Sequence, residues 1–342
     1  MAHARPPALL ALDPRHAPEL FPPEVLARLA RLVGIDAGRP LIAERFDDPA
    51  NTAVRDALAR AEVLITGWGC PPIGTSVLAA APRLRAVVHS AGSVKSLVTE
   101  ACWERGVAVS SGADTNGVPV AEFTLAAVLF AGKGVFAARE RMRAANGALS
   151  PYDLPHGIGN FRRRVGIIGA SRIGRRVIEL LRPFDLDVWL SDPYVDEAAA
   201  RALGVRLAGL DELLAGCEVV SLHAPSIPET HHLLDRGRLA LLPDGAVLIN
   251  TARGALVDTA ALTDEVASGR ITAVLDVTDP EPLPPDALLL ELPGAFLTPH
   301  LAGSLGNELQ RLGSAAVDEV ERLVTGVPFA RPVHREDLAR SG

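Results

Sequence analysis

The stretch Val165-Gly166-Ile167-Ile168-Gly169-Ala170-Ser171-Arg172-Ile173-Gly174 decides the fold of the second half of this chain. It begins with a short apolar run typical of a buried strand, continues through a glycine turn and leads into a helical pattern that ends at Leu181. A strand, a tight turn and a helix start are the context in which the fingerprint G-x-G-x-x-G holds a dinucleotide pyrophosphate at the helix N-terminus. The stretch therefore predicts a dinucleotide site, with an ordinary connection between a strand and a helix as the alternative.

Ser171 stands where the fingerprint has its second glycine. That glycine lets the backbone approach the pyrophosphate closely. Two interpretations of the serine are open: its hydroxyl donates a hydrogen bond to a phosphate, or its side chain pushes the cofactor slightly outward.

Asp192 is the candidate ribose ligand. It ends a second apolar run, Asp187 to Ser191, and follows Gly169 by about 23 residues, where roughly 20 are expected. A carboxylate there accepts hydrogen bonds from both ribose hydroxyls and repels a 2′-phosphate, which predicts NAD rather than NADP. The alternative is that Asp192 only begins an Asp-Pro turn.

Three side chains that follow expected strands form a set suited to reducing a 2-keto acid: Arg253, Glu281 and His300. An arginine binds a carboxylate and polarises a neighbouring carbonyl through its planar donors. A histidine delivers a proton, and a carboxylate bonded to its ring fixes the tautomer and favours the charged form. Taken singly, each residue has an ordinary explanation, namely surface charge for Arg253 and Glu281 and a turn or cap for His300.

The chain resembles the D-isomer-specific 2-hydroxyacid dehydrogenase family in an ordered set of motifs over about 220 residues: Gly169 to Gly174, Asp192-Pro193, His223-Ala224-Pro225, Asn250-Thr251-Ala252-Arg253-Gly254, Asp276-Val277, Glu281-Pro282-Leu283 and Thr298-Pro299-His300. The resemblance implies that Arg253 binds the substrate, that His300 is the acid/base and that Glu281 is its partner. It also implies a set of cofactor-binding residues: Gly169, Ser171, Arg172, Ile173, Gly174, Asp192, His223, Ala224, Pro225, Thr230, Thr251, Ala252 and Asp276.

The loop after an earlier expected strand is the second half of the expected substrate site. By the resemblance, backbone N–H groups of Ala91, Gly92 and Ser93 bind the substrate carboxylate together with Arg253 and His300. The alternative is a plain turn in which Ser93 is the N-cap of a helix.

Composition agrees with an ordinary enzyme. The 342 residues are 48% hydrophobic and 22% charged, which predicts a large core and two domains. A formal net charge of −7 argues against nucleic acid as a partner, and no stretch was expected to reach the length of a membrane span. Three widely spaced cysteines indicate reduced thiols in a cytoplasm. His223, His231 and His232 lack further ligands at metal-binding spacing, so no metal is expected.

Short apolar runs alternate with helical patterns throughout, which predicts two doubly wound parallel sheets of the α/β class. The first sheet is expected to use Ala8 to Leu12, Pro40 to Arg45, Val63 to Thr66, Leu84 to Val88 and Val107 to Ser110, and the second begins at Val165. A single helix from Pro119 to Ala144 is expected to lead into the second domain. With the resemblance, this predicts a discontinuous, flavodoxin-like substrate domain (residues 1–118 and 301–342) and a Rossmann NAD-binding domain (119–300).

The expected function is therefore hydride transfer between NAD(H) and a small 2-keto or 2-hydroxy acid of the D-isomer, by a homodimer that pairs through its cofactor domains, as the resemblance implies. Two rivals remain. Formate dehydrogenase shares the fold, but it requires a glutamine beside the histidine, where this chain has Glu281. An NAD-sensing scaffold or corepressor keeps the fold and the same three residues without significant turnover.

Overall fold

The computed structural model describes residues 5–35, 51–154 and 157–339, so the predicted strand from Pro40 to Arg45 lies outside the described residues. The chain divides into two compact units. Unit 1 comprises residues 1–117 and 304–340, and unit 2 comprises residues 118–303 with the last two residues. The divisions expected from the sequence, after residue 118 and after residue 300, lie close to these.

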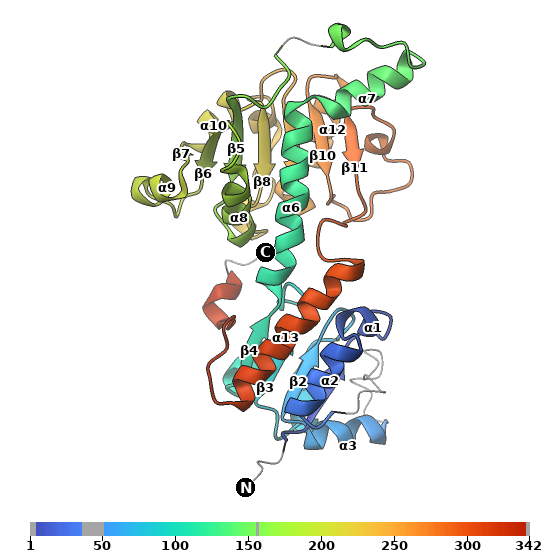
Figure 1. The fold of residues 1–342 in the computed structure, drawn as a ribbon, viewed down its shortest axis with the longest axis vertical. Helices are drawn as coiled ribbons and strands as arrows, with labels where there is room; N and C mark the ends of the chain where they lie inside the picture. Colours follow the sequence, from blue (N-terminus) through green and yellow to red (C-terminus); the bar gives the residue numbers. More distant parts are fainter. Residues whose placement is uncertain (1–4, 36–50, 155–156, 340–342) are drawn as a thin grey trace. The chain divides into compact units, whose positions relative to one another are not determined.

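Unit 1 is built on a parallel sheet whose described strands run in the order β1 (Ala8–Ala11), β2 (Val63–Thr66), β3 (Ala86–His89) and β4 (Ala108–Ser111). Its helices are α1 (Ala17–Leu20), α2 (Pro23–Leu32), α3 (Thr52–Arg60), α4 (Thr75–Ala80), α5 (Glu100–Glu104) and α13 (Leu309–Val324). Figure 1 shows α2 and α13 together on one face of this sheet, although they are almost 300 residues apart in the sequence.

Alternate residues of these strands belong to two separate hydrophobic cores, one on each face of the sheet. Leu10, Ile65 and Val88 pack against α2 and α13, whereas Leu64 and Val87 pack against α3, α4 and α5. Successive side chains of a strand point to opposite faces, so a sheet covered on both faces needs continuous apolar runs of this kind. The prediction of a doubly wound parallel sheet is confirmed.

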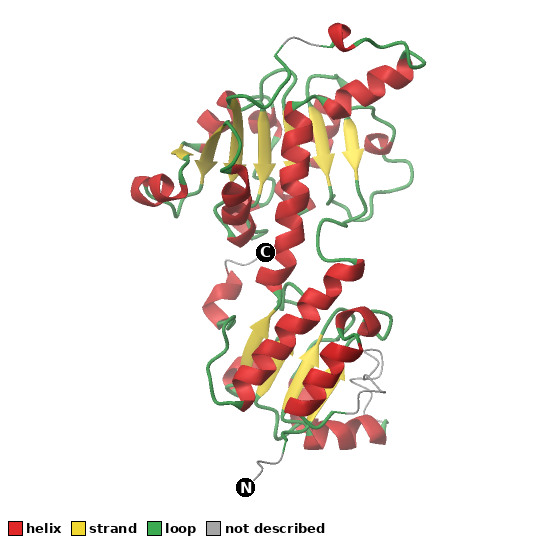
Figure 2. Cartoon of the chain, in the orientation of Figure 1, coloured by secondary structure: helices red, strands yellow, loops and turns green. Residues whose placement is uncertain are grey.

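Unit 2 holds a parallel seven-stranded sheet in the order β11-β10-β9-β8-β5-β6-β7 (Figure 2). The strands are β5 (Arg163–Ile168), β6 (Leu186–Ser191), β7 (Arg206–Leu207), β8 (Val219–Leu222), β9 (Val247–Asn250), β10 (Thr272–Leu275) and β11 (Ala295–Leu297). The helices are α6 (Ala113–Gly132), whose first turn belongs to unit 1, α7 (Val135–Ala144), α8 (Arg172–Leu181), α9 (Glu197–Leu203), α10 (Leu210–Gly216), α11 (Arg236–Leu239) and α12 (Thr259–Ala267).

Helices cover both faces of the second sheet. Ile167 and Ile249 pack with α6, α8 and α9, and their neighbours Ile168 and Leu248 pack with α10, α11 and α12. The chain leaves β5 in one direction through β6 and β7 and returns to its other side at β8. This reversal is the point in open α/β sheets where ligands bind, beyond the carboxyl ends of the strands.

The prediction of one helix from Pro119 to Ala144 is wrong. The structure has two helices, and Pro119 lies inside α6 instead of starting it. They are separated at Gly134, which adopts a left-handed conformation with φ +64° that a continuous helix cannot include. Gly132 ends α6 beside Asn160, whose side-chain amide donates to the Leu129 carbonyl (3.1 Å). A Cβ on Gly132 would lie 1.8 Å from Asn160 Oδ1, so a larger residue there would displace the Asn160 side chain.

Helix α6 also corrects the expectation that no stretch is long enough to span a membrane. Among the described residues it alone passes on length and composition. However, 56% of its apolar window is buried within the protein, and Ala121, Ala127 and Val128 pack against the sheet of unit 2. A core helix of a globular domain passes the same test for this reason.

Candidate active site

His300 and Glu281 form the hydrogen-bonded pair that the sequence predicted. His300 Nδ1 lies 2.6 Å from Glu281 Oε1, and the two side chains are 48% and 42% exposed. Glu281 follows β10 and His300 follows the neighbouring strand β11, so both lie at the carboxyl edge of the sheet in unit 2. With Nδ1 engaged by the carboxylate, Nε2 is the ring nitrogen left to exchange a proton with a substrate oxygen.

The loop that carries His300 is held by Asp276. The Asp276 carboxylate is almost fully buried and accepts from the Thr298 hydroxyl (2.6 Å) and from the N–H groups of Leu301 (2.8 Å) and Ala302 (2.9 Å). His300 itself adopts φ +53°, in the left-handed region that non-glycine residues rarely occupy. Its N–H bonds to the Asp276 carbonyl (3.0 Å), so the unusual conformation is maintained by several contacts.

Arg253 lies on a tight turn after β9. Its side chain is exposed, and Nη1 donates to the Ala252 carbonyl (2.6 Å). The next residue, Gly254, packs against the segment that leads to Glu281, because a Cβ at that position would lie 2.0 Å from the Thr278 carbonyl group. The loops of Arg253 and Glu281 are therefore in direct contact.

The glycine-rich turn is tight, and two of its positions leave no room for a side chain. Gly169 has φ +97°, and a Cβ there would lie 2.7 Å from the Ala224 nitrogen. A Cβ on Gly174 would lie 2.0 Å from the Gly169 carbonyl oxygen, which explains the third glycine of the fingerprint. Ser171 is the N-cap of α8, and its Oγ accepts from the Gly174 N–H (3.3 Å). Arg172 and Ile173 form the first turn of that helix.

Asp192 is fixed beside this turn. Its carboxylate accepts from the N–H groups of Ala170 (2.7 Å) and Tyr194 (2.8 Å). A carboxylate has about four acceptor positions, so two remain for ribose hydroxyls. The Arg175 Nε donates to the Ala170 carbonyl (2.9 Å), so the peptide units on both sides of Ala170 are held by side chains. These residues fit a dinucleotide.

The other predicted cofactor residues surround the same strand ends. His223 is buried with Nε2 at 2.9 Å from the Ser221 hydroxyl, and burial lowers the pKa of its imidazole to about 3, so the ring is neutral. It is followed by Ala224 and Pro225, and the Thr230 hydroxyl closes this loop by donating to the Pro225 carbonyl (2.6 Å).

Thr251 is also buried, with its hydroxyl 3.0 Å from that of Thr124 on α6. Ala252 is half-buried beside it. His231 and His232 stack on each other, with ring centroids 4.0 Å apart.

The predicted substrate loop of unit 1 follows β3. Ala91 is buried, Gly92 is half-buried and Ser93 is exposed. The Lys95 N–H approaches Ser93 Oγ at 3.4 Å in a turn, and the next helix begins only at Glu100, so the alternative reading of Ser93 as a helix N-cap is wrong.

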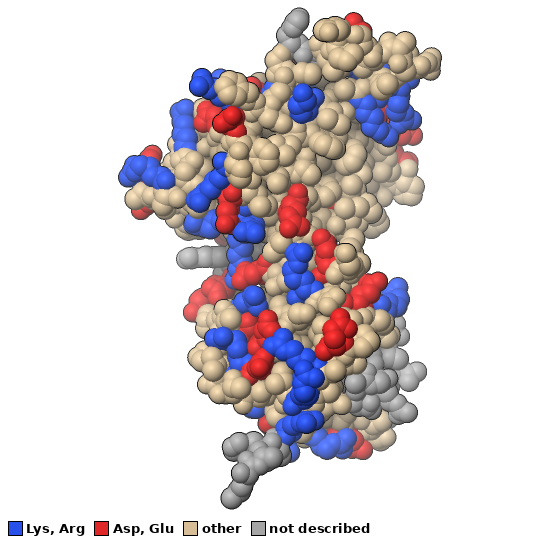
Figure 3. Space-filling view, in the orientation of Figure 1, with Lys and Arg blue, Asp and Glu red and all other residues tan. Residues whose placement is uncertain are grey.

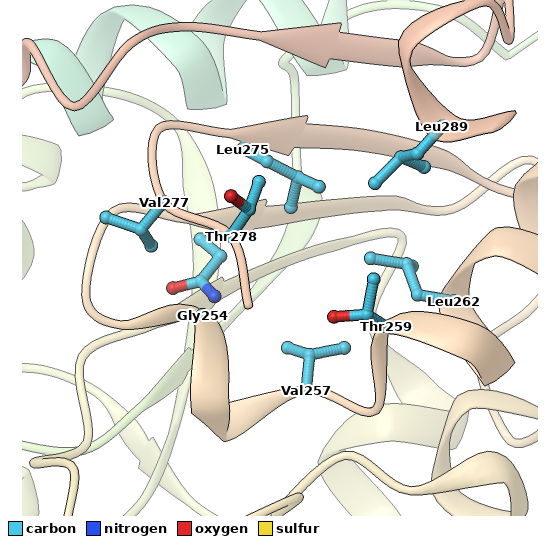
Figure 4. A pocket seen from close by; sticks show the side chains of 9 residues that line it. Gly254, Val257, Thr259, Leu262, Leu275, Val277, Thr278 and Leu289 are labelled. Atoms are coloured by element: carbon cyan, nitrogen blue, oxygen red, sulfur yellow. The ribbon is translucent and has the colours of Figure 1, made fainter. Parts of the chain in front are cut away.

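A small cavity lies behind the Arg253 turn, lined by Gly254, Val257, Leu275 and Thr278 among others (Figure 4). Its volume of about 10 Å³ holds one water molecule at most. It is a packing defect and not a substrate pocket.

Sequence reasoning missed the residues that hold the site in place. Asn250, Thr124 and Arg175 each bond to the backbone or side chain of a predicted site residue. Only Asn250 had a signal, because an asparagine near the start of a turn commonly bonds to the backbone two or three residues later. Thr124 and Arg175 depend on tertiary contacts that no local pattern contains.

The comparison with protein families matches residues 125–302, just over half of the chain, to the NAD-binding domain of the D-isomer-specific 2-hydroxyacid dehydrogenases. The D-3-phosphoglycerate dehydrogenase of Mycobacterium tuberculosis is 34% identical over 82% of this chain. The match covers 52% of that relative, so the chain spans about half the length of the phosphoglycerate dehydrogenases it resembles. Glyoxylate/hydroxypyruvate reductase B of Yersinia enterocolitica is 31% identical, with 83% of this chain and 87% of the relative covered.

The comparison with solved structures leads to the same family. A Thermus thermophilus protein superposes with a TM-score of 0.75 at 30% identity, covering 96% of this chain and 100% of that one. The D-lactate dehydrogenase of Aquifex aeolicus, solved with NAD and lactic acid, gives a TM-score of 0.68 at 26% identity, with coverages of 93% and 96%. NAD is the cofactor of the matched domain. The chain therefore belongs to the D-isomer-specific 2-hydroxyacid dehydrogenase family.

Proposed function

We propose that this protein reduces a small 2-keto acid to the D-2-hydroxy acid, with Arg253, Glu281 and His300 as its catalytic residues. The observation that carries the proposal is the 2.6 Å contact between His300 Nδ1 and Glu281 Oε1 at the carboxyl edge of the NAD-binding sheet. The contact leaves Nε2 of the half-exposed His300 side chain to exchange a proton. The loop that carries Arg253 contacts the loop that leads to Glu281.

In this mechanism each residue has one task. Bound NADH supplies the hydride to the carbonyl carbon of the substrate. The Arg253 guanidinium binds the substrate carboxylate and polarises the carbonyl. One such donor typically stabilises the transition state by about 3 kcal/mol. His300 Nε2 gives its proton to the developing alkoxide, and Glu281 stabilises the imidazolium before the transfer. Proton donation of this kind contributes roughly 100- to 10,000-fold in rate.

The cofactor site is assigned to the residues around the Gly169 turn. The backbone of Gly169 to Gly174 would hold the pyrophosphate, with the Ser171 hydroxyl free to donate because it acts as acceptor in its bond with Gly174. Asp192 would bind the adenosine ribose. Its negative charge disfavours a 2′-phosphate, so we expect a higher kcat/KM with NADH than with NADPH. The cofactor roles of His223, Ala224, Pro225, Thr230, Thr251, Ala252 and Asp276 belong to the same proposal.

For the substrate, we propose that the Ala91, Gly92 and Ser93 loop contributes N–H donors to the carboxylate. The relatives named above include enzymes of glyoxylate, hydroxypyruvate, lactate and 3-phosphoglycerate. Glyoxylate, hydroxypyruvate, pyruvate and branched or aromatic 2-keto acids are therefore the set to test.

The test is NADH oxidation with that panel of 2-keto acids. We expect turnover on at least one of them, with kcat reduced about 100-fold or more in His300→Ala while NADH affinity is retained. A protein that binds NADH and reduces none of the panel would be an NAD-sensing scaffold instead.

We also propose a homodimer formed through unit 2. Helix α7 buries none of its residues, and Phe130, Met142 and Phe161 are 52%, 51% and 72% exposed. In Figure 3 the middle of this face of unit 2 is mostly uncharged, and charged side chains gather beside α7 and along the opposite edge. A second copy of the chain would cover this apolar surface, as pairing through the cofactor domains in the family implies.

Finally, we propose a cytoplasmic location. Cys102 and Cys217 are buried thiols that form no disulfide bond. Burial raises the pKa of the Cys217 thiol to about 12, so it stays protonated and unreactive. Free thiols of this kind are typical of a reducing compartment.

A further inference from the structure

Asn250 is buried at the end of β9, and its side-chain amide bonds only to the loop that follows. Nδ2 donates to the Arg253 carbonyl (2.8 Å), and Oδ1 accepts from the Ala252 N–H (3.0 Å). These contacts fix the orientation of the amide, because a flipped side chain would place oxygen against oxygen and N–H against N–H. Asn250 therefore holds the Thr251–Ala252 and Arg253–Gly254 peptide units, which lie on either side of the Ala252–Arg253 unit.

The Ala252–Arg253 peptide unit, between the two units that Asn250 holds, connects these bonds to the arginine side chain. Its carbonyl, that of Ala252, accepts from Arg253 Nη1 (2.6 Å). The direction of that carbonyl sets where the guanidinium lies. Because Asn250 bonds to the peptide units on both sides, it limits how far this carbonyl can turn.

The backbone of Asn250 is fixed in turn. It is opposite Leu222 on β8 and Leu275 on β10, and its carbonyl accepts from the Asp276 N–H (3.0 Å). The cavity behind the turn, which Asn250 also lines, holds one water at most. If the amide were lost, solvent could not restore both of its bonds without movement of the loop.

We propose that Asn250 is the positioning residue for Arg253: it orients the guanidinium toward the substrate carboxylate without touching the substrate. The proposal rests on the substrate-binding role proposed for Arg253. It predicts that altering Asn250 weakens the use of the 2-keto acid while leaving NADH binding intact.

Asn250→Asp is the decisive variant, because it keeps the shape and the acceptor for Ala252 N–H but replaces the donor to the Arg253 carbonyl. We expect kcat/KM for the 2-keto acid to fall about 10- to 100-fold, mainly through KM, with the Kd for NADH within about twofold of wild type. The deficit relative to wild type should narrow as pH falls, since protonation of the introduced carboxyl restores a donor. Asn250→Ser, which keeps one hydrogen-bonding group, should lower kcat/KM for the 2-keto acid by a smaller factor. It replaces Asn250→Asp in the test if that variant is poorly soluble.

Two further variants distinguish loss of Arg253 positioning from a general loss of packing around the turn. Val257→Ala removes packing from the same cavity without changing a side-chain hydrogen bond, and it should leave KM for the 2-keto acid near wild type. Combining Asn250→Asp with Arg253→Ala should cost little more than Arg253→Ala alone, because Asn250 acts through that arginine.

Additive losses in the double variant, an equal rise in KM in Val257→Ala, or wild-type KM in both Asn250 variants would overturn the inference. If Arg253→Ala itself retains normal turnover, the proposed function is what fails, and the two failures are thereby distinguished.

Discussion

At the scale of single residues, the proposed catalytic side chains lie on turns, and buried polar residues beside them hold those turns in place. His300 is about half exposed, yet its backbone is held in a left-handed conformation by bonds to the buried Asp276. The buried Asn250 bonds to the Ala252 N–H and to the Arg253 carbonyl in the turn that carries Arg253. If these exposed side chains are catalytic, as proposed, the buried polar residues beside them give the substrate access to a fixed geometry.

Glu281→Gln should slow reduction without abolishing NADH binding. The glutamine can still bond to the His300 ring, but it carries no charge to stabilise the imidazolium that gives up the proton, so kcat should fall. The measurement is kcat for 2-keto acid reduction beside the Kd for NADH. An unchanged kcat would mean that another carboxylate supports His300.

His89 makes unit 1 sensitive to acid. It is buried beside the Thr66 hydroxyl (2.9 Å), and burial lowers the pKa of its imidazole from 6.5 to about 4. Between these values the unfolded chain binds a proton that the folded chain does not, so stability falls as pH drops, by up to about 1.4 kcal/mol per pH unit. Denaturant unfolding near pH 7 and pH 5 should show a smaller loss in His89→Gln than in wild type. Equal losses would show that His89 does not titrate in this way.

At the scale of elements, the contact between two loops holds Arg253 and Glu281 together. A Cβ in Gly254→Ala would meet the Thr278 carbonyl carbon and oxygen at 2.0 Å, and backbone cannot yield as a side-chain tip can. We expect kcat/KM for the 2-keto acid to fall by about 100-fold, since small displacements of catalytic groups have effects of this size.

Gly209→Ala is the matched control for Gly254→Ala. It lies in the same unit, at the start of α10, and nothing lies within 4 Å of the added Cβ. It should leave activity unchanged. Normal activity in Gly254→Ala would show that the loop contact is not required.

The strands were the most predictable elements. Val63–Thr66 and Val219–Leu222 have the bounds expected from the sequence, because a strand covered on both faces is a continuous apolar run. The break between α6 and α7 was not predicted, although it lies at Gly134, whose left-handed conformation interrupts the helix. Asp276 and Thr124 act through neighbours that only the folded sheet brings close.

At the scale of the whole molecule, the apolar surface of unit 2 predicts the assembly state. Light scattering at micromolar concentration should give a dimer, and Phe130→Glu should weaken it by placing a charge in the interface. Leu241→Glu, which alters an exposed apolar side chain elsewhere in unit 2, is the control and should remain dimeric. A monomeric wild-type protein would contradict the proposal.

The central claim is that the protein reduces a 2-keto acid to a D-2-hydroxy acid by means of His300. The most direct measurement is to consume a known amount of NADH with the best 2-keto acid of the panel other than glyoxylate, whose product is achiral, and to determine the amount and handedness of the product by chiral chromatography. We predict one equivalent of the D-enantiomer per NADH consumed, and almost none within the same time with His300→Ala. Formation of the L-enantiomer, a racemic product, or undiminished turnover in His300→Ala would contradict the claim.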